Sequence, residues 1–541
     1  MRSIARRSAV SSIALLAIIG LAALSASSAH AQVAGAYKVT NLISDGSVPA
    51  AVTDSSFLNP WAMSVSGTWW ISNANTGFNY VVSSTTSTIS FKVIVPPASG
   101  TGTGFPAGSV TTASSVGMIL PNGTKASFLF ATLDGTISGW NSKLGTANAV
   151  CQIVINNSSA GASYPGLALL NTATASYLLV PNFGTGNSVE VYDSNFKSTK
   201  LAGSFTDPNL PSGYAPFSIH ILNNQVYVAY ALRTASAPYR TVDAVGNGVV
   251  DVFDTNGNFV SRVATGGNLD SPWGVAIAPT KFGIFGGAIL IGNFGNGLIN
   301  AYDPKTYGYL GQLTDSTGKP LTYASLWELL PGGTPVSNST SVSGGDTSTV
   351  YFTAGLANES HGLLGAIAND TSAGTATFAL STASPNLAIS DGSSVTTFIS
   401  LAPIYGYTGV ASLSCSGLPK GATCSFGAPQ LTSSGTSPAV TSLTIQTTKQ
   451  MAAGTPPFRN PFSTAVLALL LPFGTLVGLR RRTLGPGLLR VLLVCGAVGS
   501  LGVIAGCGND AAFTPLGSSQ VTVTATSGSV SQSTTIGLVV Q

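Results

Sequence analysis

Charged side chains are scarce in this chain. Lys, Arg, Asp and Glu together make up 7% of its 541 residues, whereas roughly 25% is ordinary for a globular protein. The net charge is only +4, so the broad basic surface that nucleic-acid binding needs is missing. With 18 acidic residues and 3 histidines, chemistry that depends on several carboxylates or imidazoles has few side chains available.

Several familiar motifs are also missing from the sequence. It contains no C-x-x-C pair, EF-hand loop, P-loop or H-E-x-x-H string. The composition is nevertheless that of a folded protein, because 44% of the residues are hydrophobic and aromatic residues are spread along the chain. The length is sufficient for two or three domains.

The N-terminus has the pattern of a secretory signal peptide over residues 1–31. Three arginines within the first seven residues precede an uncharged apolar stretch, and a small-x-small triplet ends at Ala31. We therefore expect cleavage between Ala31 and Gln32 and export of the rest of the chain. A membrane anchor that is retained is the alternative.

Two apolar runs near the C-terminus, 461–479 and 491–509, carry no charge. Each has about 19 residues, or roughly 28 Å as a helix, which just spans a bilayer core. Four arginines lie between the runs, and the positive-inside rule places them on the cytoplasmic side: Arg480, Arg481, Arg482 and Arg490. We expect a transmembrane hairpin that anchors the protein with its other parts outside the cytoplasm. Two buried core helices are the alternative.

The end of the second run resembles a bacterial lipobox, Ile504-Ala505-Gly506-Cys507. This resemblance implies that 491–509 is either a membrane helix or an internal lipoprotein-like signal with lipidation at Cys507. A cysteine that merely ends a helix is the other interpretation.

Six similar units occupy residues 37–368, about 45 to 60 residues apart. Each has an aromatic or Pro-Gly start, an alternating apolar strand, a polar turn and a second strand. The units start near Asn59, Gly117, Tyr164, Ala215, Ser271 and Tyr323. This pattern predicts a six-bladed β-propeller. The strand 37–43 is expected to complete the sixth blade and so close the ring. A long array of β-sandwiches is the alternative.

Two strings in the fifth unit, Pro272–Ala276 and Asn293–Asp303, resemble NHL-type blades. The segment 37–368 as a whole is similar to an uncharacterised family of secreted bacterial proteins with an NHL-like propeller. The resemblance implies the fold, but it implies no reaction, because that family has no assigned activity.

A second β module is expected from residues 374–450 together with 514–541. The string 413–426 resembles an Ig-like module of exported bacterial proteins, and such a sandwich needs about seven strands. We therefore expect one sandwich that the membrane hairpin interrupts, with two unrelated β pieces as the alternative. Cys415 and Cys424 flank a turn, and an oxidising compartment would permit a disulfide between them. Cys151 is expected to be a buried small apolar residue.

Seven polar residues are candidates for chemistry in a propeller channel: Glu328, Glu359, His220, His361, Asn73, Asn182 and Asn293. The three asparagines recur after inner strands, where turn formation explains them. The scarcity of carboxylates favours a scaffold without catalysis or cofactor, which binds a protein, glycan or cell-envelope ligand. The alternative is a propeller hydrolase or lactonase, and the resemblance to such enzymes implies a calcium ion in the channel.

Overall fold

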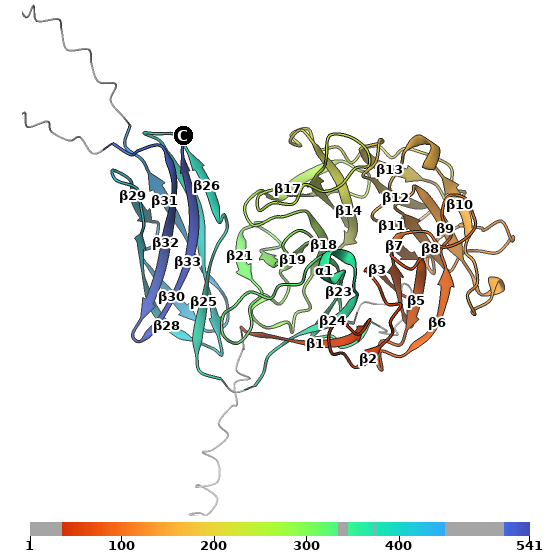
Figure 1. The fold of residues 1–541 in the computed structure, drawn as a ribbon, viewed down its shortest axis with the longest axis horizontal. Helices are drawn as coiled ribbons and strands as arrows, with labels where there is room; N and C mark the ends of the chain where they lie inside the picture. Colours follow the sequence, from red (N-terminus) through yellow and green to blue (C-terminus); the bar gives the residue numbers. More distant parts are fainter. Residues whose placement is uncertain (1–34, 334–343, 373, 450–512) are drawn as a thin grey trace, which may run out of the picture.

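The computed structural model describes residues 35–333, 344–372, 374–449 and 513–541. Almost all of the secondary structure in these ranges is β. Six small sheets surround a common centre, and a separate pair of sheets lies beside them (Figure 1). The expectation of an all-β protein with a propeller is confirmed.

The first three blades lie between residues 60 and 192. Blade 1 contains β3 (Pro60–Val65), β4 (Trp69–Asn73), β5 (Phe78–Val82) and β6 (Ile89–Ile94). Blade 2 contains β7 (Pro106–Thr111), β8 (Phe128–Thr132), β9 (Thr136–Trp140) and β10 (Gln152–Asn156). Blade 3 contains β11 (Ala168–Asn171), β12 (Ser176–Asn182) and β13 (Ser188–Tyr192).

The other three blades complete the ring. Blade 4 contains β14 (Tyr214–Leu222), β15 (Gln225–Leu232), β16 (Val249–Phe253) and β17 (Phe259–Thr265). Blade 5 contains β18 (Pro272–Ile277), β19 (Ile289–Asn293), β20 (Ile299–Tyr302) and β21 (Tyr309–Gln312). Blade 6 contains β22 (Leu326–Pro331), β23 (Thr349–Ala354), β24 (Leu363–Asn369), β1 (Tyr37–Ser44) and β2 (Val52–Thr53).

The burial of each strand follows from its place in a blade. Strands packed on both faces by neighbouring blades, such as β19, are buried along their whole length, whereas the outer strand β17 is partly exposed. The inner strands contact one another in a closed circle: β3, β7, β11, β14, β18, β22 and again β3. Glycine permits this close approach, because a Cβ at Gly274 of β18 would lie 2.4 Å from the carbonyl oxygen of Trp327 in β22.

The ring is closed by a strand from the beginning of the described chain. β1 pairs antiparallel with β24, from Tyr37 opposite Asn369 to Ser44 opposite Leu363. This pairing joins the two ends of the propeller and covers an edge of β24 that would otherwise be open.

Blade 2 differs from the expected unit. Its inner strand is β7, which starts at Pro106, and not the segment that starts near Gly117. Residues 117–120 lie in the connection between β7 and β8, where Met118 is buried and adopts a positive φ. The apolar residues of this segment resembled a strand because Met118 and Leu120 pack into the hydrophobic cluster shared by blades 2 and 3.

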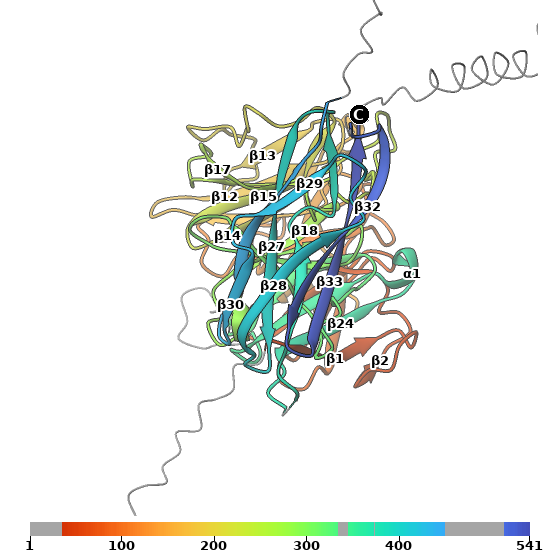
Figure 2. The same cartoon turned by 90° about the vertical axis from the view of Figure 1, so that its left-hand side faces the viewer.

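The second β module is a sandwich of two sheets, seen face-on in Figure 2. One sheet contains β25 (Thr377–Thr382), β27 (Ser394–Ile404), β31 (Ala439–Gln446) and β29 (Thr423–Phe426). The other contains β26 (Asn386–Ile389), β33 (Val530–Val540), β32 (Gly517–Ser527), β28 (Thr408–Ser416) and β30 (Gln430–Ser434). The last two strands of the chain therefore share one sheet with strands that lie about a hundred residues earlier in the sequence.

Two local links hold the sandwich together. A disulfide joins Cys415 of β28 to Cys424 of β29 and so connects the two sheets. The backbone N–H of Thr514 donates to the Thr448 carbonyl oxygen at 2.9 Å. The two described segments that flank residues 450–512 are therefore adjacent at this point.

The sandwich packs against blade 5 of the propeller. Ala402 and Ile404 of β27 belong to the same buried cluster as Phe285 and Leu313 of the propeller. The Asn268 side-chain amide also donates to the Thr382 carbonyl oxygen at 2.6 Å. A shared apolar core with buried hydrogen bonds fixes the orientation of the two modules.

The predicted membrane anchorage has to be corrected. In the ranges that the structure describes, no helix is both long and apolar enough to cross a bilayer. The predicted spans 461–479 and 491–509, the four arginines between them and Cys507 lie outside these ranges, as does the predicted signal peptide 1–31 with its cleavage site. Within the described ranges, the structure therefore gives no support to the expected membrane-anchored localisation.

A buried ion-pair network stabilises blade 4. The Arg262 guanidinium binds the carboxylates of Asp207 and Asp251, and its Nε lies 3.1 Å from Asp251 Oδ1. Both aspartate side chains are fully shielded from solvent. The more exposed pair between Lys92 and Asp54, at 2.7 Å, provides a natural comparison.

We expect Arg262→Ala to lower the free energy of unfolding by about 3–5 kcal/mol, because two buried carboxylates lose their cation. The matched variant Lys92→Ala should cost about 1 kcal/mol or less, since its pair is open to water. Urea unfolding of both variants at neutral pH measures the difference. Equal losses of unfolding free energy in the two variants would show that the Arg262 network contributes no more to stability than the Lys92–Asp54 pair.

Candidate functional site

The central channel of the propeller is blocked halfway by an aromatic plug, formed by Trp61, Phe217, Trp273 and Trp327. The rings contact one another pairwise. Trp61 and Trp327 stack with centroids 3.4 Å apart, and Trp273 lies 6.3 Å from Trp61 and 6.1 Å from Trp327. All four side chains are almost completely buried. The plug separates a cavity on one side from a pocket on the other, which we call the mouth.

β-Bulges explain why the aromatic rings point into the channel. The pairing register shifts between Pro216 and Ser218, and between Pro272 and Gly274, and each shift leaves the aromatic residue between them without an opposite partner. The inner strands β3, β7 and β22 have similar shifts at the same level. A bulge changes the direction in which side chains point. It also interrupts the ladder of backbone hydrogen bonds, so proline, which has no N–H to donate, is tolerated there.

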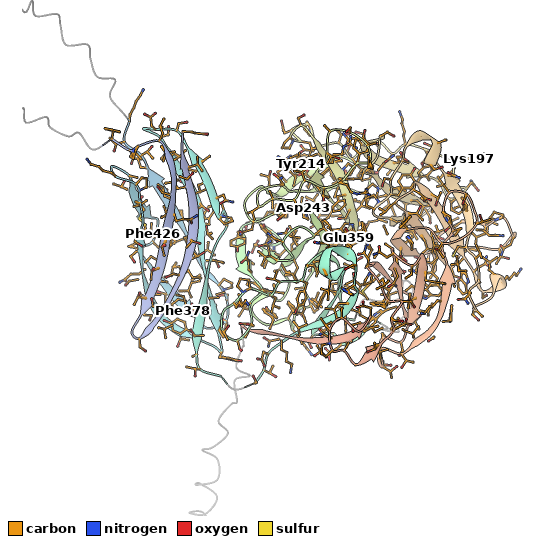
Figure 3. All side chains as sticks on the ribbon, in the orientation of Figure 1. Lys197, Tyr214, Asp243, Glu359, Phe378 and Phe426 are labelled. Atoms are coloured by element: carbon orange, nitrogen blue, oxygen red, sulfur yellow. A yellow bond between two sulfur atoms is a disulfide. The ribbon has the colours of Figure 1, made fainter. Side chains whose placement is uncertain are left out.

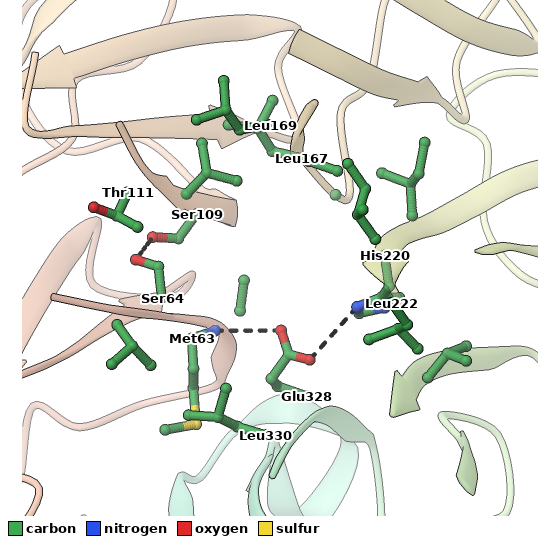
Figure 4. A pocket seen from close by; sticks show the side chains of 18 of the residues that line it. Met63, Ser64, Ser109, Thr111, Leu167, Leu169, His220, Leu222, Glu328 and Leu330 are labelled. Atoms are coloured by element: carbon green, nitrogen blue, oxygen red, sulfur yellow. Dashed lines mark hydrogen bonds and ion pairs between the residues drawn. The ribbon is translucent and has the colours of Figure 1, made fainter. Parts of the chain in front are cut away.

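One bulge also positions the carboxyl group of the channel. In β22 the shift spans Leu326 to Leu329, so it includes Trp327 and Glu328. Glu328 therefore follows the plug residue directly and faces the cavity on the opposite side from the mouth (Figure 4). The cavity measures about 390 Å³.

Four of the polar side chains of the cavity form two separate pairs, and Thr111, Ser114 and Asn171 are further polar residues of its lining. Ser64 and Ser109 share a hydrogen bond of 2.7 Å between their hydroxyl groups. On the other side, Glu328 Oε1 lies 3.8 Å from His220 Nδ1 (Figure 4). Among the described residues that line the cavity, Glu328 and His220 are the only ones that titrate.

Burial keeps both titratable groups neutral near pH 7. It raises the pKa of Glu328 to about 8, although backbone N–H groups of Met63 and Leu329 oppose this rise. It lowers the pKa of His220 to about 4, against the effect of the Trp273 carbonyl oxygen. Desolvation destabilises the charged form of each group, and this effect is larger than the stabilisation of the charged form by the weak hydrogen bonds.

The mouth, a pocket of about 260 Å³, lies where loops before the inner strands meet loops between the second and third strands of the blades. Its lining combines aromatic and polar side chains from five blades: Asn59, Phe105, Tyr239, Arg240, Phe294 and Glu359. Phe105 is 51% exposed, and Tyr239 and Phe294 are half-buried. Figure 3 labels Glu359, the last residue of α1 (Leu356–Glu359), and Asp243.

Asn59 connects the mouth to the plug. Its Oδ1 accepts a hydrogen bond of 2.9 Å from the Trp327 indole N–H, and its Nδ2 donates to Glu359 Oε2 at 2.7 Å. Burial raises the pKa of Glu359, whereas Asn59 and Arg240 lower it and Asp243 raises it further, with a net increase. Among the described residues, only one oxygen of the Glu359 carboxylate has a side-chain partner.

The backbone that carries Glu359 is strained. In the single turn α1 (Leu356–Glu359), Ala357, Asn358 and Glu359 have φ values of 51°, 55° and 67°. A left-handed conformation costs roughly 1–2 kcal/mol for each non-glycine residue. Strain of this kind concentrates at functional sites, and Asn59 on the facing loop is also left-handed, with φ 48°.

The other sequence candidates have structural partners. The side chains of Asn182 and Asn293 bind backbone groups, with Asn182 Oδ1 accepting from Gly184 at 2.9 Å and Asn293 Nδ2 donating to Asn268 at 2.7 Å. Asn73 donates to the Ile71 carbonyl oxygen in the same way. His361 lies 2.6 Å from Asp45 on the exterior of blade 6.

Sequence reasoning selected Glu328, His220 and Glu359, but it assigned all of them to one channel site. The structure separates Glu328 and His220 from Glu359 by the aromatic plug. The plug itself was missed, although three Pro-aromatic pairs carried the signal: Pro60-Trp61, Pro216-Phe217 and Pro272-Trp273. Their recurrence was interpreted only as the start of each repeat. The structure shows that each pair lies at a bulge whose aromatic side chain points into the channel.

Comparison with known proteins gives limited matches. No protein-family model matches the chain. It is 27% identical over 348 residues to the uncharacterised protein R648 of Acanthamoeba polyphaga mimivirus, an alignment that covers 62% of this chain and 80% of that protein.

Two solved structures resemble part of the fold. The PQQ-bound aldose sugar dehydrogenase of Streptomyces coelicolor shares 11% identity over 61% of this chain and 98% of its own, with a TM-score of 0.37. An arabinofuranosidase of Fusarium graminearum, arb93a, shares 10% identity over 62% of this chain and 98% of its own, with a TM-score of 0.39. Both are enzymes by name, but likeness at this level carries no conclusion about activity.

The expected membership of a bacterial NHL-like family was wrong. The relatives found by sequence are proteins of a virus, and no NHL or Ig-like family model matches. The NHL resemblance rested on short Pro-Trp-Gly and Asn-Phe-Gly strings. In the structure, the Pro-Trp-Gly string forms a bulge and a close approach of two strands, and the Asn-Phe-Gly string begins a turn. These features are not specific to one propeller family.

The cavity predicts a pH dependence of stability. Glu328 ionises near pH 4.5 in the unfolded chain and near pH 8 in the folded protein, so its contribution is fully present below pH 4.5 and is lost as the pH rises to 8. The contribution of His220 to stability changes in the opposite direction: it is fully present above pH 6.5 and is lost as the pH falls to 4. Of these two cavity groups, only Glu328 should contribute above pH 6.5, with a slope of about 1.4 kcal/mol per pH unit.

Glu328→Gln should therefore remove this loss between pH 6.5 and 8, as measured by urea unfolding at several pH values. Asp254→Asn is the control, because Asp254 lies in an exposed turn and ionises at acidic pH in both states. A parallel pH profile for wild type and Glu328→Gln would contradict the assignment.

Proposed function

We propose that the propeller is a non-catalytic ligand-binding domain and that a glycan occupies its mouth. The observation that carries the proposal is the set of partly exposed aromatic rings around the Glu359–Asn59 pair, where loops of several blades converge. This is the scaffold function expected from the sequence, without the membrane anchorage.

The aromatic rings suit the apolar faces of sugar rings. Phe105, Tyr239 and Phe294 contribute rings that water reaches at least in part. Aromatic faces bind C–H groups through dispersion and burial of apolar area. Arg233 stacks over Tyr239 at 4.2 Å and donates to the Phe183 carbonyl oxygen at 2.7 Å, which holds that ring in place.

The polar groups suit hydroxyl groups. Glu359 and Asn59 offer acceptors and donors, and Arg240 offers further donors. The volume of about 260 Å³ is below the roughly 300–1,000 Å³ of sites for drug-sized molecules. A single sugar residue of a longer chain fits such a pocket better than a whole folded partner does. A peptide segment of a protein is the competing occupant.

The residues of the channel do not fit the calcium ion of the alternative hydrolase. Calcium takes 6–8 oxygen ligands, with carboxylates prominent among them, whereas the cavity offers a single carboxyl group, one imidazole, four hydroxyl groups and one amide among apolar side chains. Within the ranges that the structure describes, no group of three or more His, Cys, Asp or Glu side chains could hold a metal. We derive no reaction step through such an ion.

Glu359→Gln should weaken glycan binding by at least about tenfold, because a charged acceptor of hydroxyl groups becomes a neutral amide. A glycan array identifies the best oligosaccharide for the wild-type protein, and titration calorimetry with that oligosaccharide compares the variants. Phe294→Ala should weaken binding as well, since a stacking face is removed.

Asp254→Asn serves as the control and should bind like wild type. Absence of binding to any glycan would overturn the proposal, as would equal affinity of the wild-type protein and both mouth variants. Binding of peptides in place of glycans at the same residues would assign the mouth to a protein partner instead.

A further inference from the structure

The cavity on the far side of the plug holds two facing groups, neutral His220 and Glu328, which form a pair of facing hydrogen-bond acceptors when Glu328 is ionised. His220 Nε2 lies 3.0 Å from the Trp273 carbonyl oxygen. A carbonyl oxygen only accepts, so the proton of the neutral ring lies on Nε2, and Nδ1 presents its lone pair. That lone pair faces Glu328 Oε1 at 3.8 Å, which is too long for a direct hydrogen bond.

The Glu328 carboxyl group has only weak partners. The backbone N–H of Leu329 donates to Oε1 at 3.2 Å, and that of Met63 donates to Oε2 at 3.4 Å. Both distances are at or beyond the long end of the usual range. The Ser64 and Ser109 hydroxyl groups bind each other instead, and the Glu328 side chain is 9% exposed.

The rest of the cavity wall is mainly apolar and leads to solvent. Val65 and Leu329 next to the polar pair are buried, whereas Leu169, Ile221 and Leu330 toward the strand ends are half-buried. A ligand that enters from this side meets an apolar wall first and the two acceptors at the end.

We propose that this cavity binds a small aliphatic amine, with its ammonium group between Glu328 and His220 and its alkyl chain along the apolar wall. An ammonium group carries several N–H donors and one positive charge, so it can satisfy both acceptors at once. A carboxylate in such a site would meet another carboxyl group, and an alcohol has a single donor and no charge.

Binding transfers one proton to solvent. In the free protein Glu328 holds a proton at pH 7, because burial raises its pKa to about 8. The ammonium ion pairs with the carboxylate form, so the Glu328 proton leaves as the amine enters. His220, the other titratable group that faces Glu328 in the described cavity wall, stays neutral.

The experiment uses the full chain and three probes of equal length: hexylammonium, 1-hexanol and hexanoate. Titration calorimetry of wild type should show hexylammonium bound at least about tenfold more tightly than 1-hexanol, and no binding of hexanoate. Repeating the titration in buffers of different ionisation enthalpy should show release of close to one proton per amine at pH 7.

Glu328→Gln should weaken hexylammonium binding by at least about tenfold and abolish the proton release, while 1-hexanol binding stays unchanged. Unchanged 1-hexanol binding also shows that the cavity of the variant is folded. Asp254→Asn is the matched control and should behave like wild type.

The proposal is overturned if wild type binds 1-hexanol as tightly as hexylammonium, or if Glu328→Gln leaves the amine affinity unchanged. The first result would assign the cavity to neutral molecules, and the second would show that Glu328 does not hold the ammonium group. The wild-type selectivity among the three probes does not depend on any variant. It is also independent of glycan binding, because the plug lies between the two sites.

Discussion

The aromatic plug is the interaction on which the arrangement of the propeller depends. Inner strands from different blades each contribute a side chain to the channel axis, and a bulge in five of them brings that side chain out of the regular pairing. Stacking of Trp61 on Trp327 then joins blade 1 to blade 6 at the centre of the ring, just as β1 joins the two ends of the propeller at its edge. The plug therefore stabilises the ring and also divides its channel into two chemically different spaces.

The two spaces use scarce charge in different ways. At the mouth, the Glu359 carboxylate is near water and has Asn59 and Arg240 around it, so it suits polyhydroxylated ligands. In the cavity, Glu328 has only weak backbone partners and a neutral histidine, so it suits a cationic donor. A chain in which 7% of the residues are charged thus places one carboxyl group in a buried cavity and another on a strained turn. Arg262 shows the contrasting structural use, since it neutralises two carboxylates inside blade 4.

The sandwich adds a second constraint. Its core includes strands from both sides of residues 450–512. Hydrogen bonds between Thr448 and Thr514 hold the two described segments together next to these residues. Its contact with blade 5 is a continuous apolar cluster that includes Phe285 and Ile404. The propeller and the sandwich therefore form one unit, and the mouth and the cavity both lie within the ring, away from this contact.

Local patterns in the sequence determined the strands, the sixfold repetition and the closing role of residues 37–43, because alternating apolar residues between turn-forming residues have few other solutions. They also selected Glu328, His220 and Glu359 as rare titratable residues of the propeller. Only the tertiary structure decided that Glu328 and Glu359 face opposite sides of a plug. Bulges in β22 and the left-handed turn at Ala357–Glu359 set those directions, and both depend on packing between blades rather than on the residues of a single strand. The start of blade 2 was misassigned for the same reason, since Met118 is apolar because of what covers it and not because it lies in a strand.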